Sequence, residues 1–254
     1  MRKPVIAANW KMYKTPAQTQ EFVTAFLPLV AGPNQNEQAR AEIVLCPSAT
    51  SLATVVAAVG GSGIAVGGQN IHFAEEGAYT GETSAQMLTA LKVSHVIIGH
   101  SERRQYFCET DEIVNQKVHT ALKHGLTPIL CIGELLEERE AGKTEEVLLK
   151  QASIALKGIS AEQAKQIVVA YEPVWAIGTG KTATPEMAGE AHFLIRTEIA
   201  RLQGREVADA IRILYGGSVK PDNAASLLNQ PEIDGALVGG ASLVAESFAK
   251  IVKF

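Results

Sequence analysis

The chain has 254 residues, of which 46 % are hydrophobic and 20 % charged, with a formal net charge of −4 and a pI near 5.9. Such a chain can form one large α/β domain or two smaller ones, with a sizeable core. Because nucleic acids and acidic membranes are bound through clustered positive charge, the acidic balance argues against both as general partners.

The cysteine pattern and the N-terminal sequence indicate the cellular compartment in which the protein is expected. Three widely spaced cysteines occur, without a C-x-x-C pair: Cys46, Cys108 and Cys131. They suggest neither a disulfide framework nor a zinc site and fit a reducing compartment. The first apolar stretch is interrupted at Asn9 and Lys11, too early for a signal-peptide core or a membrane span. We therefore expect a cytoplasmic protein.

Short apolar segments alternate with longer amphipathic ones along the chain. The apolar segments are residues 5–8, 43–46, 64–67, 95–98, 128–132, 167–171, 211–214 and 236–238. The amphipathic segments are residues 15–29, 51–59, 84–91, 111–124, 145–156, 185–202, 222–228 and 243–252. Several begin at capping residues such as Thr15, Ser84 and Asp111. This alternation predicts a parallel sheet covered by helices.

That pattern alone permits a doubly wound sheet. Eight regular βα units in about 250 residues favour a (β/α)₈ barrel instead. No Pro/Ser-rich linker or shift in composition divides the chain, so we predict a single domain spanning residues 1–254.

Chemically unusual residues follow the ends of several predicted strands. They are Asn9 and Lys11 after the first, His100 after the fourth, Glu172 after the sixth, Gly216, Gly217 and Ser218 after the seventh, and Gly239 and Gly240 after the eighth. In a closed parallel barrel all these strand ends share one rim. We therefore expect residues far apart in sequence to converge on one pocket.

Glu172 lies between an apolar strand and a glycine-ended loop. Pro173 disfavours the α region for Glu172 and so keeps its carboxylate at the open end of the strand. The following loop has a bulky apolar middle, which suits a lid above a general base. A solvated turn is the alternative. A phosphate-binding P-loop is excluded, because Trp175 stands where that motif needs glycine.

His100 ends the fourth strand and precedes an expected helix start, where extra positive charge is disfavoured. We expect a neutral imidazole that donates a hydrogen bond, with a structural histidine as the alternative. His100 and Glu102 match the H-x-E part of the zinc deaminase motif, but the P-C-x-x-C part of that motif does not follow. No metal is therefore required. His95 is expected to be structural, and His192 and the other histidines to lie in loops or on helix surfaces.

The remaining candidates would bind an anion. Lys11 puts a cation at the mouth of the first strand, although an ordinary surface lysine is the alternative. The glycine pairs after strands seven and eight stand where barrels of this kind commonly bind phosphate. Glycines let backbone N–H groups approach an anion closely, and a following short helix adds its positive end. Each pair alone is a weak signal, since Gly-Gly often marks only a turn.

These residues belong to motifs that run through the whole chain: ANWK at 8–11, GQN at 68–70, GAYTGE at 77–82, GHSERR at 99–104, AYEPVWAIGTG at 170–180, YGGSV at 215–219 and LVGGA at 237–241. In this order the chain resembles the triosephosphate isomerase family, departing slightly at Gly68 and Tyr79, where relatives often have Ala and Phe. The resemblance implies a TIM barrel that interconverts dihydroxyacetone phosphate and D-glyceraldehyde 3-phosphate in glycolysis and gluconeogenesis, without a cofactor.

The resemblance also implies the roles of individual residues. Glu172 is the proton acceptor and His100 the electrophile, and Asn9 and Lys11 contact the substrate. Its phosphate is held by Gly178, Ser218, Gly239 and Gly240. The chemistry agrees, because removing a proton beside a carbonyl needs a base on carbon, a donor or cation on oxygen, and shielding from water. We expect Glu102 to support the Lys11–His100 pair.

The loop from Asn70 to Gly81 exceeds the two to six residues usual for a βα connection, so we expect it to reach another molecule or the site. In the family this loop inserts into a second subunit. The resemblance therefore implies a homodimer through the 70–81 loop, with Thr80 near the neighbour's pocket and no nucleic-acid or membrane partner.

Two other functions are compatible with a barrel. A phosphosugar aldolase would need a Schiff-base lysine that projects into the barrel, whereas Lys11 and Lys181 are predicted in loops. A barrel that only binds phosphorylated ligands would need neither a carbon base such as Glu172 nor a lid.

Overall fold

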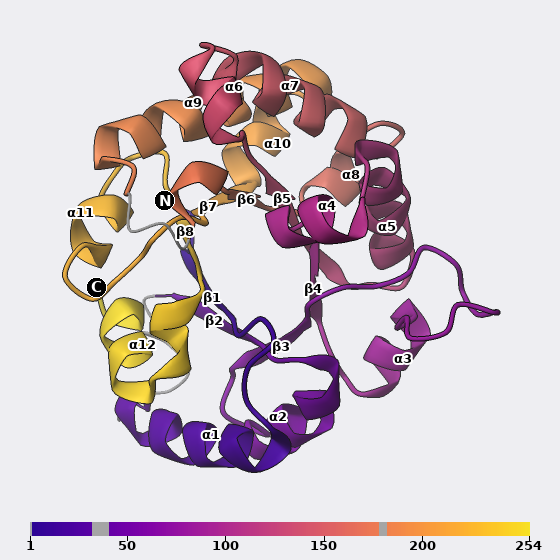
Figure 1. Cartoon of the computed structure of the whole chain (residues 1–254), viewed down its shortest axis with the longest axis vertical. Helices are drawn as coiled ribbons and strands as arrows, with labels where there is room; N and C mark the ends of the chain where they lie inside the picture. The colour runs from indigo at the N-terminus through magenta and orange to yellow at the C-terminus, as the bar shows by residue number, and fades with distance from the viewer. Residues whose placement is uncertain (1, 32–40, 178–181) are drawn as a thin grey trace.

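A computed structural model describes residues 2–31, 41–177 and 182–254. Eight parallel strands form a closed barrel in chain order, ringed by helices (Figure 1). The strands are β1 (Val5–Asn9), β2 (Glu42–Cys46), β3 (Ala65–Gly68), β4 (His95–Ile98), β5 (Thr127–Ile132), β6 (Val168–Tyr171), β7 (Arg212–Tyr215) and β8 (Gly235–Val238). The predicted (β/α)₈ fold is thus confirmed, and each predicted strand end lies within one residue of the observed one.

Helices cover the outside of the barrel. They are α1 (Pro16–Val30), α2 (Leu52–Ala58), α3 (Ala85–Ala90), α4 (Ser101–Phe107), α5 (Asp111–Lys123), α6 (Leu136–Glu140), α7 (Thr144–Ala155), α8 (Ala161–Ala164), α9 (Pro185–Gln203), α10 (Arg205–Ala210), α11 (Ala224–Leu228) and α12 (Ala245–Val252). Single 3₁₀ turns are η1 (Ala49–Ser51), η2 (Val174–Ala176) and η3 (Gly240–Leu243). Within the described ranges, no helix is long and apolar enough to cross a membrane.

The helix starts test the predicted capping residues. Thr15 and Ser84 cap α1 and α3, since their hydroxyls accept the N–H groups of Gln18 and Met87. The prediction for Asp111 was wrong: Thr110 caps α5 by accepting the N–H of Ile113, and Asp111 lies in the first turn. Both residue types can cap, so their order in sequence does not decide between them.

Side chains alternate across the barrel wall, as the strand period of two requires. Inward positions form a small core inside the barrel: Val5, Ala7, Val44, Cys46, Ile97, Ile129, Cys131, Val168, Ala170, Leu214 and Leu237. Outward positions such as Ile6, Ala8 and Val169 pack against the helices in the main core. Continuing the inward series by two residues reaches Asn9, Glu172, Gly216 and Gly239 at the carboxyl end of the barrel.

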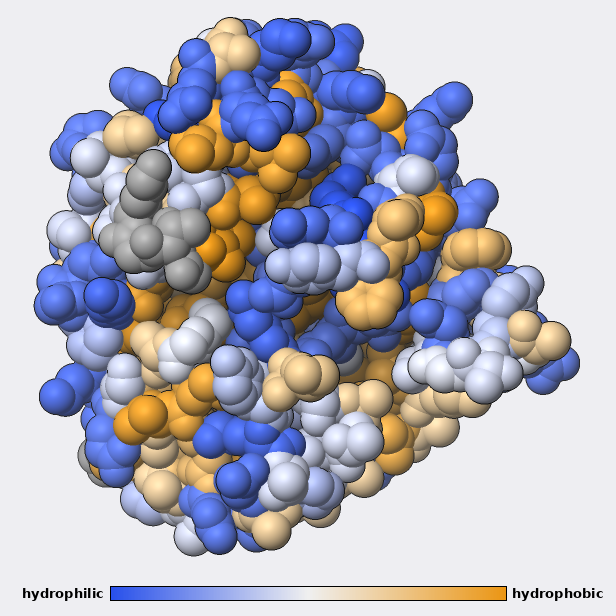
Figure 2. All heavy atoms as spheres, viewed as in Figure 1, coloured by the Kyte–Doolittle hydropathy of each residue, from blue (hydrophilic) through white to orange (hydrophobic). Residues whose placement is uncertain are grey.

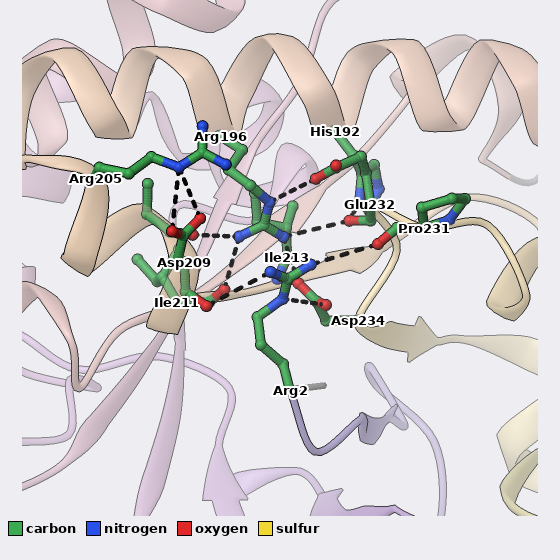
Figure 3. A network of polar contacts seen from close by, with 11 residues as sticks. Arg2, His192, Arg196, Arg205, Asp209, Ile211, Ile213, Pro231, Glu232 and Asp234 are labelled. Atoms are coloured by element: carbon green, nitrogen blue, oxygen red, sulfur yellow. Dashed lines mark hydrogen bonds and ion pairs between the residues drawn. The ribbon is translucent and has the colours of Figure 1, made fainter.

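The amino end of the barrel is held by an ionic network (Figure 3). Arg196 on α9 and Arg2 before β1 converge on Asp234, with N–O distances of 2.5 and 2.6 Å. Arg196 also donates to Glu232 at 2.6 Å and to the backbone oxygen of Ile211 at 3.0 Å. Because this network lies at the end opposite the predicted site, we assign it to stability.

His192 lies in the same region and corrects one prediction. It was expected in a loop or on a helix surface, but its side chain on α9 is fully buried. Nδ1 is 3.2 Å from the backbone oxygen of Glu232, which suits an Nδ1–H donor. Burial lowers the pKa of His192 to about 3. The apolar residues of α9 predict which face of the helix is buried, but they do not show that His192 belongs to that face.

The buried His192 predicts a pH-dependent stability. The unfolded chain binds a proton at His192 below about pH 6.5, whereas the folded chain resists it down to about pH 3. Unfolding free energy should therefore fall with decreasing pH between these values, at up to about 1.4 kcal/mol per pH unit. Urea titrations at pH 4 to 7 should show a shallower dependence for His192→Gln. Equal slopes in both proteins would contradict this assignment.

Candidate active site

The end of β1 holds a cation in a fixed backbone turn. Asn9 is buried, and its Oδ1 accepts the N–H of Lys11 at 3.0 Å. Lys11 has a φ of 50°, and its carbonyl oxygen accepts a hydrogen bond from Gln69. Its Nζ lies 2.6 Å from Oε1 of Glu102. These contacts hold the lysine at the barrel mouth, as predicted.

The end of β4 turns His100 into the same region. Gly99 has a φ of +72°, where a side chain is rarely tolerated, and this turn breaks the strand alternation. His100 then caps α4: its Nδ1 accepts the N–H of Glu102 at 3.2 Å. A ring nitrogen that accepts a backbone N–H carries no proton itself, so this contact favours an imidazole protonated on Nε2.

Glu172 follows β6 and lies against His100. Its N–H donates to the carbonyl of Ile132 at 2.8 Å, and its side chain is only 2 % exposed. Oε1 lies 2.9 Å from Nε2 of His100, and Oε2 accepts the N–H of Ser101 at 2.9 Å. The alternative of a solvated turn is therefore wrong.

The electrostatics of this pair follow from burial and contact. Burial raises the pKa of Glu172, but His100, the Ser101 N–H and the Lys11 charge lower it by more. Burial lowers the pKa of His100, but Glu172 and Glu102 together raise it by more in this arrangement. The pKa of the Glu172 carboxyl is thus low while it contacts His100 and Ser101. Moving the carboxylate away from both residues would remove the contacts that stabilise its charge.

A cavity of about 440 Å³ opens beside the pair. Its lining includes Asn9, Lys11, His100, Glu172, Ile177, Gly216, Gly217, Ser218, Gly239 and Gly240. Figure 2 shows this face of the barrel, where hydrophilic and hydrophobic side chains both surround the mouth. Residues from all five predicted strand ends thus meet at one cavity.

Glycine is required at the edge of this cavity. A Cβ on Gly216 would lie 2.9 Å from Cγ of Glu172 and 3.0 Å from the carbonyl oxygen of Tyr171, so even alanine would crowd the base. Gly239 lies beside the Lys11 side chain, where an added Cβ would be 3.5 Å from Cε. The Gly216 N–H donates to the carbonyl oxygen of Tyr171 at 2.7 Å. The steric requirement for glycine is therefore strict at Gly216, whereas the distance at Gly239 is an ordinary van der Waals contact.

Some predicted residues are placed differently or not at all. Gly178 lies outside the described residues, as does Lys181. The predicted lid is described from Val174 to Ile177, beginning with one 3₁₀ turn. Among the described residues, no group of three or more His, Cys, Asp or Glu side chains could hold a metal ion.

One contact of the site was not predicted from the sequence. Ser101 was not singled out, although its N–H holds the Glu172 carboxylate. The expected helix start after His100 could have signalled a free N–H at this position. The expected support of the Lys11–His100 pair by Glu102 is confirmed, because Glu102 ion-pairs with Lys11 and its N–H donates to Nδ1 of His100.

The fold and site together define an enzyme of the barrel class that moves a proton on a small anionic substrate. Its cavity brings together a buried carboxylate that can accept a proton, an imidazole and a cation that can polarise an oxygen, and several glycines.

Comparison with known sequences identifies the family within this class of enzymes. A family model described as triosephosphate isomerase matches residues 4–254. Proteins named triosephosphate isomerase from Solibacter usitatus and Clostridium acetobutylicum are 59 % and 55 % identical to this chain over 254 residues, covering 100 % of both chains in each case. One from Caldanaerobacter subterraneus subsp. tengcongensis is 54 % identical over the same full length. The chain belongs to the triosephosphate isomerase family.

Proposed function

We propose that this chain interconverts dihydroxyacetone phosphate and D-glyceraldehyde 3-phosphate through an enediolate, in glycolysis and gluconeogenesis, and that residues 1–254 act as one catalytic domain. Family membership supports the reaction. The observation that carries the site assignment is the buried contact of 2.9 Å between Glu172 and His100 at the glycine-lined cavity.

Glu172 acts as the base on carbon. Binding of the substrate moves its carboxylate away from Ser101 and His100, and the burial that remains raises its pKa toward the range of an effective base. It takes the proton from the carbon beside the carbonyl and returns it to the neighbouring carbon. Because the same carboxyl does both, no cofactor is needed.

His100 and Lys11 act on oxygen. Once Glu172 no longer contacts His100, burial keeps the imidazole neutral, so Nε2–H donates to the oxygen on which charge develops. Lys11 supplies a positive charge that Glu102 and Asn9 hold in place. Asn9 contributes its side-chain amide to the substrate from the adjacent inward position.

The phosphate lies against the segments after β7 and β8. Ser218, Gly239 and Gly240 line that end of the cavity, and Gly178 completes the group from the lid. Residues 174–179 act as the lid, which keeps water away and holds the phosphate in a geometry that resists its elimination from the enediolate.

A coupled assay tests the function directly. The unmutated protein should convert glyceraldehyde 3-phosphate to dihydroxyacetone phosphate without added metal or cofactor, and absence of turnover would contradict the proposal. Borohydride should not trap the substrate on a lysine, whereas a trapped adduct would favour the aldolase alternative.

A homodimer through the 70–81 loop forms part of the proposal. This loop projects from the barrel between β3 and α3 (Figure 1). Beside it lies a groove of about 500 Å³, lined by Met12, Tyr106 and Phe107 and also by Lys11 and His100. Met12, Tyr106 and Phe107 are 94 %, 68 % and 64 % exposed in the single chain, and such a cluster of exposed apolar residues is typical of an interaction surface. A partner's loop in this groove would cover the apolar residues and support Lys11. We also propose a cytoplasmic location, which the three widely spaced cysteines support, and no nucleic-acid or membrane partner, which the net charge of −4 supports.

The dimer predicts a concentration-dependent activity. Sedimentation should give twice the 27.0 kDa of one chain. Tyr79→Asp, at an exposed site in the loop, should weaken association by at least about 2 kcal/mol and lower the activity of dilute samples. Phe193→Asp, at an exposed site on α9, is the control and should stay dimeric. A fully active monomer would contradict the proposal.

A further inference from the structure

One side chain joins the end of β5 to α7. Gln151 on α7 binds Gly133 twice: its Oε1 accepts the Gly133 N–H at 2.8 Å, and its Nε2 donates to the Gly133 carbonyl at 3.1 Å. A single half-buried amide therefore satisfies both backbone groups of a residue that lies just beyond β5.

Gly133 in turn lies directly against the backbone of Glu172. A Cβ added to Gly133 would be 1.7 Å from the carbonyl oxygen of Glu172 and 2.6 Å from its carbonyl carbon. On either side of this contact, the Glu172 N–H donates to Ile132 at 2.8 Å and the Val174 N–H donates to Glu134 at 3.2 Å. Residues 132–134 thus form the surface on which the backbone of Glu172 rests.

We propose that Gln151 is a positioning residue for the isomerisation, fixing the backbone of Glu172 through Gly133. This inference depends on the proposed role of Glu172 as base. Glu172 must leave Ser101 and reach the substrate carbon with little error, and a displacement of about 1 Å can cost about 100-fold in rate. Gln151 does not line the cavity that would hold substrate. It lines a separate cavity of about 310 Å³, which Glu172 also borders.

The position of Gln151 predicts which kinetic constant changes. The phosphate-binding segments follow β7 and β8 and make no described hydrogen bond to Gln151. Loosening Gly133 should therefore disturb the base and leave substrate binding nearly intact. The loss should appear in kcat, with little change in KM.

Gln151→Met tests this, because methionine preserves the length of the side chain and removes both hydrogen bonds. We expect kcat, measured on folded dimer, to fall about tenfold while KM changes less than about twofold. Gln151→Glu keeps an acceptor for the Gly133 N–H, but its second carboxylate oxygen would face the Gly133 carbonyl oxygen without a donor, so kcat should fall here too. If Gln151→Met does not fold, Gln151→Glu should still show a reduced kcat at unchanged KM.

Gln203→Met is the matched control. Gln203 is also half-buried near a helix end and donates to a backbone carbonyl, that of Ile159, at 3.1 Å, but far from the site in the fold. The kcat of the Gln203→Met variant should equal that of the unmutated protein. The inference is overturned if both Gln151 variants keep a normal kcat, or if Gln203→Met loses as much. An inactive unmutated protein would instead refute the proposed function itself.

Discussion

Glu172→Gln should lower kcat by about 10²- to 10⁴-fold, because a positioned general base contributes that much and glutamine cannot accept the proton. The fold should survive, since the amide matches the carboxylate in shape and its oxygen can still accept the Ser101 N–H. Its NH₂ would then face Nε2–H of His100, so a small loss of stability is expected as well.

The measurement combines turnover with phosphate binding. The coupled assay gives kcat, and competitive inhibition by inorganic phosphate should stay within about twofold of the unmutated protein, since the phosphate segments are untouched. Glu137→Gln, at an exposed position on α6, should behave as the unmutated protein. Near-normal turnover in Glu172→Gln would remove this residue from the mechanism.

His100→Asn should lower kcat by about 10²- to 10³-fold, the usual cost of losing one donor to a developing oxyanion. Asparagine is a favourable N-cap, so α4 should keep its first turn. Its shorter amide cannot reach the place that Nε2 occupies beside Glu172. The variant therefore removes the Nε2–H donor while it keeps the N-cap of α4.

The pH profile gives a second readout for this variant. His100 lowers the pKa of Glu172, so its removal should raise that pKa. Protonation of the base ends activity on the acid side, and the acid limb of kcat/KM should accordingly move to higher pH. His95→Asn, at the buried structural histidine of β4, is the control and should leave the acid limb in place. An unmoved acid limb in His100→Asn would show that the two residues are not coupled.

Much of the site follows from the strand pattern. The ordinal positions of Asn9, His100, Glu172 and the glycine pairs were enough to predict one rim, because all strand ends of a parallel barrel point the same way. The period of two also orients the residues: Val168 and Ala170 face inward, and Glu172 continues their series. That rule fails for His100, where Gly99 turns the chain.

Other features depend on contacts between distant segments. Ser101 and Glu172 are 71 residues apart, and nothing local in either segment shows that a backbone N–H meets the carboxylate. Gln151 and Gly133 belong to an ordinary helix and an ordinary strand end, and only their packing makes them neighbours of the base.

The sequence by itself determined the alternation of strands and helices, the order of the polar strand ends and the family. These depend on periodicity and on motifs, which are local properties of the chain. Tertiary structure alone decided that Glu172 rests between His100 and Ser101, that Gln151 supports its backbone and that His192 is buried. Each of these depends on the closure of the barrel, which sets distances that neighbouring residues in sequence do not encode.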